Sequence, residues 1–136
     1  MIVPDTSVVI AAAAPWHVLH EPAARALAAE TPALIAHVAY ETTAALSRMP
    51  EGHRISPSVV LEWIDQRFPH DWLVLPPREA RTTLHLVVAR GIRGGSLYDA
   101  LVAGTAKHHG QPLLTADRRA APTYAAVGVD AVEVAS

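Results

Sequence analysis

The N-terminal stretch that decides the fold is IVPDTSVVIAAAA, residues 2–14. Its apolar start, Ile2-Val3, predicts a short buried strand, and the run from Val8 to Ala14 predicts a helix that Pro15 ends. Between the two lies Asp5, followed by two hydroxyl residues. The stretch therefore predicts a strand, an acidic group at the end of that strand, and a helix.

The same alternation continues along the chain. Apolar runs predict further strands at 33–36, 72–75, 112–115 and 129–134, and amphipathic runs predict helices over 20–30, 38–48, 56–67, 78–90 and 96–109, with a short helix after Asp117. Strands separated by helices are typical of right-handed crossovers and a parallel sheet covered on both faces. We predict an α/β fold: one three-layer α/β/α domain over residues 1–136, with a central parallel sheet of four to five strands.

Composition excludes several functional classes. The chain has 136 residues, a hydrophobic fraction of 51%, a charged fraction of 18%, a formal net charge of −2 and no cysteine. The length and the hydrophobic fraction predict a packed core rather than disorder. The charge argues against a broadly basic nucleic-acid surface, and the lack of cysteine excludes disulfides and thiolate sites. The N-terminus does not resemble a signal peptide and residues 8–14 are too short to span a bilayer, so we expect a cytoplasmic protein without membrane contact.

Four carboxylates are expected at one edge of the sheet. Asp5 ends the first strand, Glu41 lies in the first turn of the helix after the second, Asp99 lies in the first turn of the helix before the fourth, and Asp117 follows that fourth strand. Strand C-termini and helix N-termini share one edge in such folds, where ligands bind. The four acids should therefore converge although they are far apart in sequence.

Each acid, taken alone, has a structural explanation. Asp5 and Asp117 suit N-caps or an Asx turn, Ser96-x-x-Asp99 suits a capping box, and Glu41 is favourable near a helix N-terminus. Convergence of all four is harder to explain this way, because one pair of charges at ~4 Å repels by roughly 4 kcal/mol at an effective dielectric constant of ~20. A divalent cation would relieve this repulsion. Oxygen ligands suit Mg²⁺, with Mn²⁺ as the alternative, and such ions support phosphodiester hydrolysis.

Four short motifs give the chain a resemblance to a known family. They are Val3-Pro4-Asp5-Thr6-Ser7, Tyr40-Glu41-Thr42, Tyr98-Asp99-Ala100-Leu101-Val102-Ala103 and Leu114-Thr115-Ala116-Asp117-Arg118. Their order and spacing resemble those of PIN-domain ribonucleases of the VapC toxin type over nearly the full length. The resemblance implies a Mg²⁺- or Mn²⁺-dependent endoribonuclease that acts on RNA, is the toxin of a type II pair with a VapB-like antitoxin, and often forms a homodimer.

The resemblance also implies roles for individual residues. Asp5 and Asp99 correspond to the principal metal ligands, and Glu41 and Asp117 to acids that ligate directly or through water. Thr6, Ser7 and Thr115 correspond to hydroxyl positions that orient the acids, a role that ligating carboxylates require on physical grounds as well.

Residues outside these motifs add weaker expectations. Arg93 and Arg118 are candidates for contacts to RNA phosphates, with ordinary surface arginine as the alternative. His37, four residues before Glu41, is placed to face it across one helical turn. The chain has three Trp, three Tyr and one Phe, which is little material for stacking bases, so we expect recognition by RNA shape and phosphate position.

Two other functional classes remain open. A phosphoaspartate phosphatase also begins with an acid after its first strand, but Ser7 occupies the place of its second acid and Lys107 is the only lysine. A non-catalytic module could use an acidic pocket to capture a partner's arginine, as the family's antitoxins often provide. Metal-dependent turnover would separate this binding module from an enzyme.

Overall fold

The computed structural model describes residues 1–135, so Ser136, the last residue of the expected domain, lies outside the described residues. Seven α-helices, one 3₁₀ helix and three strands are assigned within that range. In chain order they are β1 (Val3–Pro4), α1 (Thr6–Ala13), α2 (His20–Ala29), α3 (Ala36–Ser47), α4 (Pro57–Arg67), α5 (Pro77–Ala89), α6 (Ser96–His108), β2 (Leu113–Thr115), η1 (Arg118–Ala120), α7 (Ala121–Val127) and β3 (Ala131–Glu133).

The strands form a small parallel sheet in the order β1-β2-β3. Two further extended segments continue the same row through single bridges, one between Ile2 and Pro32 and one between Ile35 and Leu73. The amide of Ala33 donates to the carbonyl of Ile2 at 2.8 Å, and the amide of Leu73 donates to the carbonyl of Leu34 at 2.8 Å. Five segments thus lie in one row, of which three are regular strands.

The row has fewer inter-strand hydrogen bonds than a regular sheet of four to five strands, as predicted, would have. The predicted strands at 33–36 and 72–75 pair only at single positions. Pro32 has no amide to donate to a ladder, and the chain after Ile35 turns at once into α3. The prediction of an α/β/α arrangement around a parallel sheet is confirmed.

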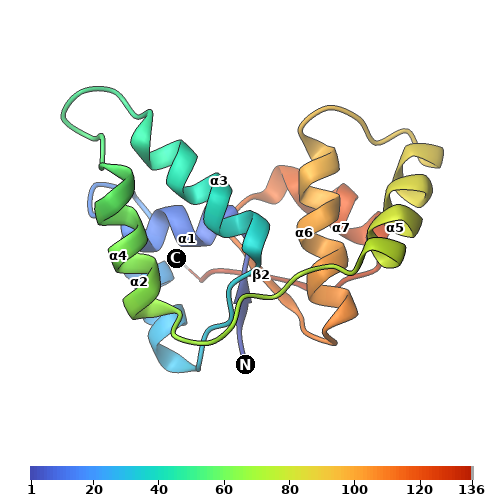
Figure 1. Ribbon diagram of the computed structural model, residues 1–136, viewed down its shortest axis with the longest axis horizontal. Coiled ribbons are helices and arrows are strands. Elements are labelled where there is room, and N and C mark those ends of the chain that lie inside the picture. Colours follow the sequence, from blue (N-terminus) through green and yellow to red (C-terminus); the bar gives the residue numbers. More distant parts are fainter. Residues whose placement is uncertain (136) are drawn as a thin grey trace.

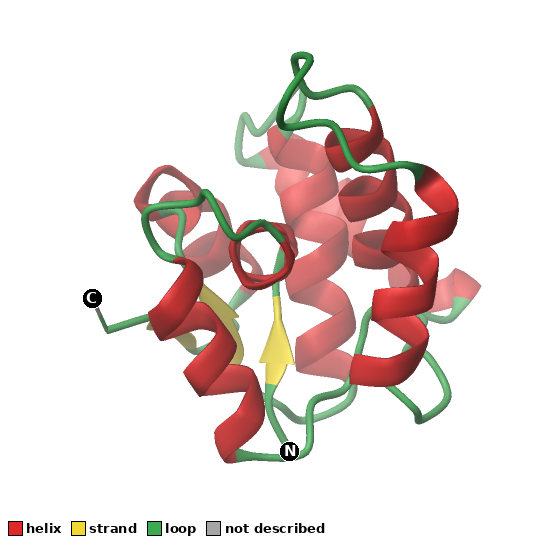
Figure 2. Ribbon diagram, turned by 90° about the vertical axis from the view of Figure 1, so that its left-hand side faces the viewer, coloured by secondary structure: helices red, strands yellow, loops and turns green. Residues whose placement is uncertain are grey.

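The helices pack in two groups on either side of the sheet, as Figure 1 shows. One group is α1 to α4 and the other is α5 to α7, and each helix packs against neighbours of its own group. Figure 2, turned by 90°, shows a strand between helices on both sides. Among residues 1–135, no helix has both the length and the apolar character needed to cross a bilayer.

Apolar side chains from both helix groups meet over the sheet. Val3 and Leu113 on adjacent strands, and Val9, Val38 and Ala103 on the covering helices, are fully buried. Because parallel strands in such a fold are covered on both faces, their N-terminal and interior residues cannot carry polar groups at low cost. The polar groups are therefore concentrated where the strands end.

Candidate active site at the carboxyl edge of the sheet

Asp5 lies where β1 ends and α1 begins, and its side chain is almost fully buried. It is 3% exposed and caps α1, because its Oδ1 accepts from the amide of Val8 at 3.2 Å. The hydroxyl of Ser7 donates to the same oxygen, and the hydroxyl of Tyr124 donates to Oδ2 at 2.7 Å. Three donors therefore stabilise the ionised carboxylate and fix its orientation.

Ser7 also connects β1 to β2. Its Oγ accepts from the amide of Ala116 at 2.9 Å, just after β2. The adjacent backbone bond, from the amide of Asp5 to the carbonyl of Leu114, measures 2.8 Å. The edge that carries Asp5 is thereby tied to the segment that carries Asp117.

Glu41 joins this edge from α3. Because α3 begins at Ala36 rather than at the predicted residue 38, Glu41 lies in the second turn, and the expected position in the first turn is wrong. The Thr6 hydroxyl donates to its Oε1 at 3.0 Å. His37 Nε2 lies 3.3 Å from the same oxygen, one helical turn away as expected, but makes no hydrogen bond among the described residues.

Asp117 follows β2 and caps η1. Its Oδ1 accepts from the amide of Arg119 at 3.0 Å and lies 3.5 Å from the Arg119 Nε. Thr115 Oγ1 accepts from the amide of Asp117 at 3.0 Å. The hydroxyl of Thr115 thus holds the backbone of this turn rather than the carboxylate itself.

Asp99 faces the other three acids from the first turn of α6. The pKa of its carboxyl group is raised from 3.8 to about 6, first by burial and then by the charges of Asp117, Glu41 and Asp5. The expected capping box is wrong, because Gly95 is the N-cap and its helix end has no side-chain cap bond. Asp99 therefore bears the electrostatic cost of the convergence without acting as a cap.

The four carboxylates suit a hard divalent cation by their chemistry. They offer only oxygen ligands, and three of them raise the pKa of the fourth, Asp99, by their charge. Among residues 1–135, no three His, Asp or Glu side chains are already close enough to form a complete ligand cluster. A bound cation would therefore have to draw these side chains inward against their mutual repulsion, which its own charge would offset.

The sequence analysis missed Tyr124. Its ring is 2% exposed, and burial followed by the Asp5 charge raises the pKa of its hydroxyl, which therefore stays protonated and donates. A tyrosine in a short apolar helix predicts core packing, and nothing in the local sequence indicates that the Tyr124 hydroxyl reaches Asp5. Only the fold brings residues 5 and 124 together.

The two arginines predicted to contact RNA phosphates are both exposed. Arg93 is exposed in the loop before α6. Arg118 pairs with Glu133 on β3, with Nε 3.3 Å from Oε2, and its side chain is 85% exposed. Arg119, the next residue along the chain, is the arginine that contacts an acid of the site.

The phosphoaspartate alternative does not suit this geometry. Lys107, the only lysine, donates from Nζ to the carbonyl of Val127 at 3.0 Å and approaches the position where Gly128 would carry a Cβ. It lies near the end of α6, whereas Asp99 lies in the first turn of the same helix. A catalytic lysine beside Asp5 is therefore not available from this position.

Comparisons with known proteins agree with this architecture. A family profile described as PIN domain matches residues 2–125. The chain is 42% identical over 130 residues to "Ribonuclease VapC40" of Mycobacterium tuberculosis, covering 96% of both chains. It is 37% identical over 134 residues to "Ribonuclease VapC27" of the same organism, covering 96% of this chain and 95% of the relative.

Solved structures with the same fold are more distant in sequence. The FitAcB structure from Neisseria gonorrhoeae matches with a TM-score of 0.70 at 20% identity, covering 96% of both chains. The VapBC2 structure from Rickettsia felis, bound to a promoter DNA fragment, matches with a TM-score of 0.67 at 16% identity and covers 98% of both. The resemblance inferred from the four motifs is confirmed: the chain belongs to the PIN domain family, among the relatives named VapC ribonucleases.

Proposed function

We propose that this protein is a divalent-metal-dependent endoribonuclease and the toxin of a type II toxin–antitoxin pair. The observation that carries the proposal is the convergence of Asp5, Glu41, Asp99 and Asp117 on one edge with the Asp99 pKa raised to about 6. The names of the two curated relatives supply the substrate class, RNA. Mg²⁺ is the proposed cofactor, with Mn²⁺ as the alternative.

The proposed ligands differ in how firmly they are held. Asp5 is fixed by three donors, and Glu41 is held by the Thr6 hydroxyl. Asp117 is held by the amide of Arg119, whereas half-buried Asp99 makes no side-chain hydrogen bond among the described residues, so it is the side chain expected to move toward a cation. This combination gives one rigid anchor and a more adaptable opposite side.

A bound Mg²⁺ would activate water, steady the leaving oxygen and offset the phosphate charge. The protein's own part is to hold the acids around the reacting phosphate and to position the RNA chain. Arg119 and Arg93 at the rim are suitable for contacts to neighbouring phosphates, and Arg118 would have to leave Glu133 to join them.

A VapB-like antitoxin is the proposed partner. Arg119 already lies against Asp117, which indicates that this acidic edge accepts a guanidinium group. An arginine from a partner could occupy the same edge and exclude RNA. We also propose a homodimer acting in the cytoplasm, where its RNA substrate is found. Size-exclusion chromatography with light scattering tests the dimer.

The direct test is RNA cleavage by the purified protein with Mg²⁺ or Mn²⁺, with and without chelator. Asp99→Asn and Asp5→Asn should each lower the cleavage rate by about a hundredfold or more, whereas Asp65→Asn, a matched exposed acid on α4, should not. Calorimetry should show that Mn²⁺ binding weakens in the same two variants. Undiminished cleavage in Asp99→Asn, or full activity in chelator, would refute the proposal.

A further inference from the structure

A hollow lies beside Glu41, between α3 and α6. Its volume is about 370 Å³, and its lining includes Thr6 from α1, His37 and Glu41 from α3, Arg48 just after α3, and Tyr98 from α6. Pockets of roughly 300 Å³ and above are large enough for small ligands. Because Glu41 is one of the four acids, this α3–α6 hollow opens directly from the candidate active site.

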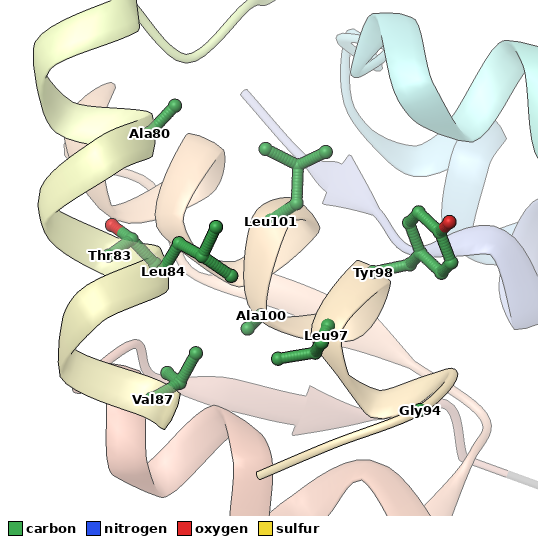
Figure 3. A pocket seen from close by; sticks show the side chains of 9 residues that line it. All are labelled: Ala80, Thr83, Leu84, Val87, Gly94, Leu97, Tyr98, Ala100 and Leu101. Carbon is green, nitrogen blue, oxygen red and sulfur yellow. The ribbon is translucent and has the colours of Figure 1, made fainter. Parts of the chain in front are cut away.

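One wall of the hollow is an aromatic pair. The rings of His37 and Tyr98 stack with centroids 5.3 Å apart and planes at 10°. Tyr98 is nevertheless 55% exposed, so one aromatic face is available to solvent. Figure 3 shows its ring directed away from the apolar side chains of α5, although Tyr98 also lines the hollow of about 340 Å³ that these side chains border.

The C-terminal end of α3 supplies a positive charge to the same hollow. His37 and Glu41 share one face of α3, since positions four residues apart lie above one another on a helix, and Arg48 is the C-cap residue seven positions beyond Glu41. Arg48 is exposed and makes no ion pair within residues 1–135. The hollow therefore offers an aromatic face and a free cation about two turns of helix from an acid of the site.

We propose that the α3–α6 hollow is a nucleoside subsite, in which the base next to the cleaved phosphate stacks on Tyr98 and the following phosphate contacts Arg48. The inference rests on the proposed function, because Glu41 marks the end at which the phosphate is cut. A nucleotide combines a flat base with an anionic phosphate, which complement the Tyr98 ring and the Arg48 guanidinium group of the hollow. A composition poor in aromatic residues predicts recognition by RNA shape, but one tyrosine at this place supplies a stacking surface.

The test compares Tyr98→Leu, which keeps an apolar side chain without a π-face, with Tyr40→Leu on the neighbouring α3. Tyr40 is 74% exposed and does not line the hollow, so it is a matched control. His37→Gln and Arg48→Gln probe the other two groups. Each protein is assayed on a randomised RNA pool with Mg²⁺, followed by mapping of the cut ends.

Tyr98→Leu should raise KM by about fivefold to a hundredfold and flatten the base preference beside the cut, with a smaller change in kcat. Arg48→Gln should raise KM with the base preference retained. If Tyr98→Leu and His37→Gln keep the KM and the base preference of Tyr40→Leu, the subsite is refuted while the nuclease stands.

A second measurement does not depend on activity. Adenosine and uridine 5′-monophosphates are titrated against the protein in chelator, with the ring resonances of Tyr98 and His37 followed by NMR. Shifts at both rings in the wild type, with the His37 shift lost in Tyr98→Leu, support the subsite even if RNA is not cut, in which case only the proposed function fails. Absence of any ring shift at millimolar nucleotide overturns the subsite.

Discussion

Replacing Asp99 by asparagine should stabilise the metal-free protein at neutral pH. The folded chain raises the pKa of this carboxyl group from 3.8 to about 6, so its ionised form is disfavoured by burial and by three neighbouring acids. Such a change corresponds to roughly 3 kcal/mol. Because the side chain is only half-buried, solvent screening reduces the expected effect to about 1–2 kcal/mol.

The sign of the pH dependence follows from proton binding. Below about pH 4 the Asp99 carboxyl is protonated in both the folded and the unfolded chain, and the penalty is absent. Between about pH 4 and 6 the folded chain holds a proton that the unfolded chain releases, so this group lowers stability as pH rises. Above about pH 6 the penalty is complete. The gain from Asp99→Asn should therefore appear over this same interval.

The assay is urea unfolding in chelator at pH 4, 5, 6 and 7.5, with Asp65→Asn as control. Asp99→Asn should unfold with a free energy about 1–2 kcal/mol above that of the wild type at pH 7.5, and equal to it at pH 4. Adding Mg²⁺ at a hundredfold excess over its dissociation constant should stabilise the wild type by about 2.7 kcal/mol and the variant by less. An Asp99→Asn protein that is no more stable than the wild type at pH 7.5 would show that the four acids do not repel one another.

Three further changes test other contacts. Tyr124→Phe removes the buried donor to Asp5 and should cost about 1.5–3 kcal/mol in urea unfolding, with weaker Mn²⁺ binding by calorimetry; unchanged stability would contradict the charged hydrogen bond. Thr6→Val should lower Mn²⁺ affinity by about tenfold to a hundredfold while circular dichroism stays that of the wild type, and an unaltered affinity would rule out its role in holding Glu41. Gly104→Val should destabilise the fold by about 1–3 kcal/mol in thermal unfolding, because a Cβ added there would lie 3.2 Å from the side chains of Leu75 and Thr83. A rise in Tm would show that these side chains can move away at no cost.

The sequence predicts the order of helices and strands well because most helices carry their own local signals. Pro57 at the first position of α4 and the apolar runs of α6 are examples. Boundaries depend on contacts that the sequence does not display. α1 begins at Thr6 because Asp5 caps it, and α3 begins at Ala36, which moves Glu41 into the second turn. The prediction of one domain over residues 1–136 stays a prediction.

The acids of the candidate site could be predicted because a parallel sheet collects its strand ends at one edge. Their partners could not. Tyr124 reaches Asp5 only through the packing of α7, and the stacking of His37 on Tyr98 joins two helices that are far apart in sequence. Which arginine meets an acid also depends on the turn at η1, where Arg119 contacts Asp117 and Arg118 turns to β3. The roles proposed for all these residues stay predictions until the variants are measured.

Asp5 both caps α1 and is a proposed metal ligand, which affects how relatives that have lost catalysis should be recognised. This side chain starts α1 and would keep that structural value in a descendant that had lost catalysis. Selection for folding alone would then preserve an aspartate at position 5. Asp99 has no such second use and raises the folding cost, so drift should erase it first. Position 99, rather than position 5, is therefore the more informative marker of a lineage that still cuts RNA.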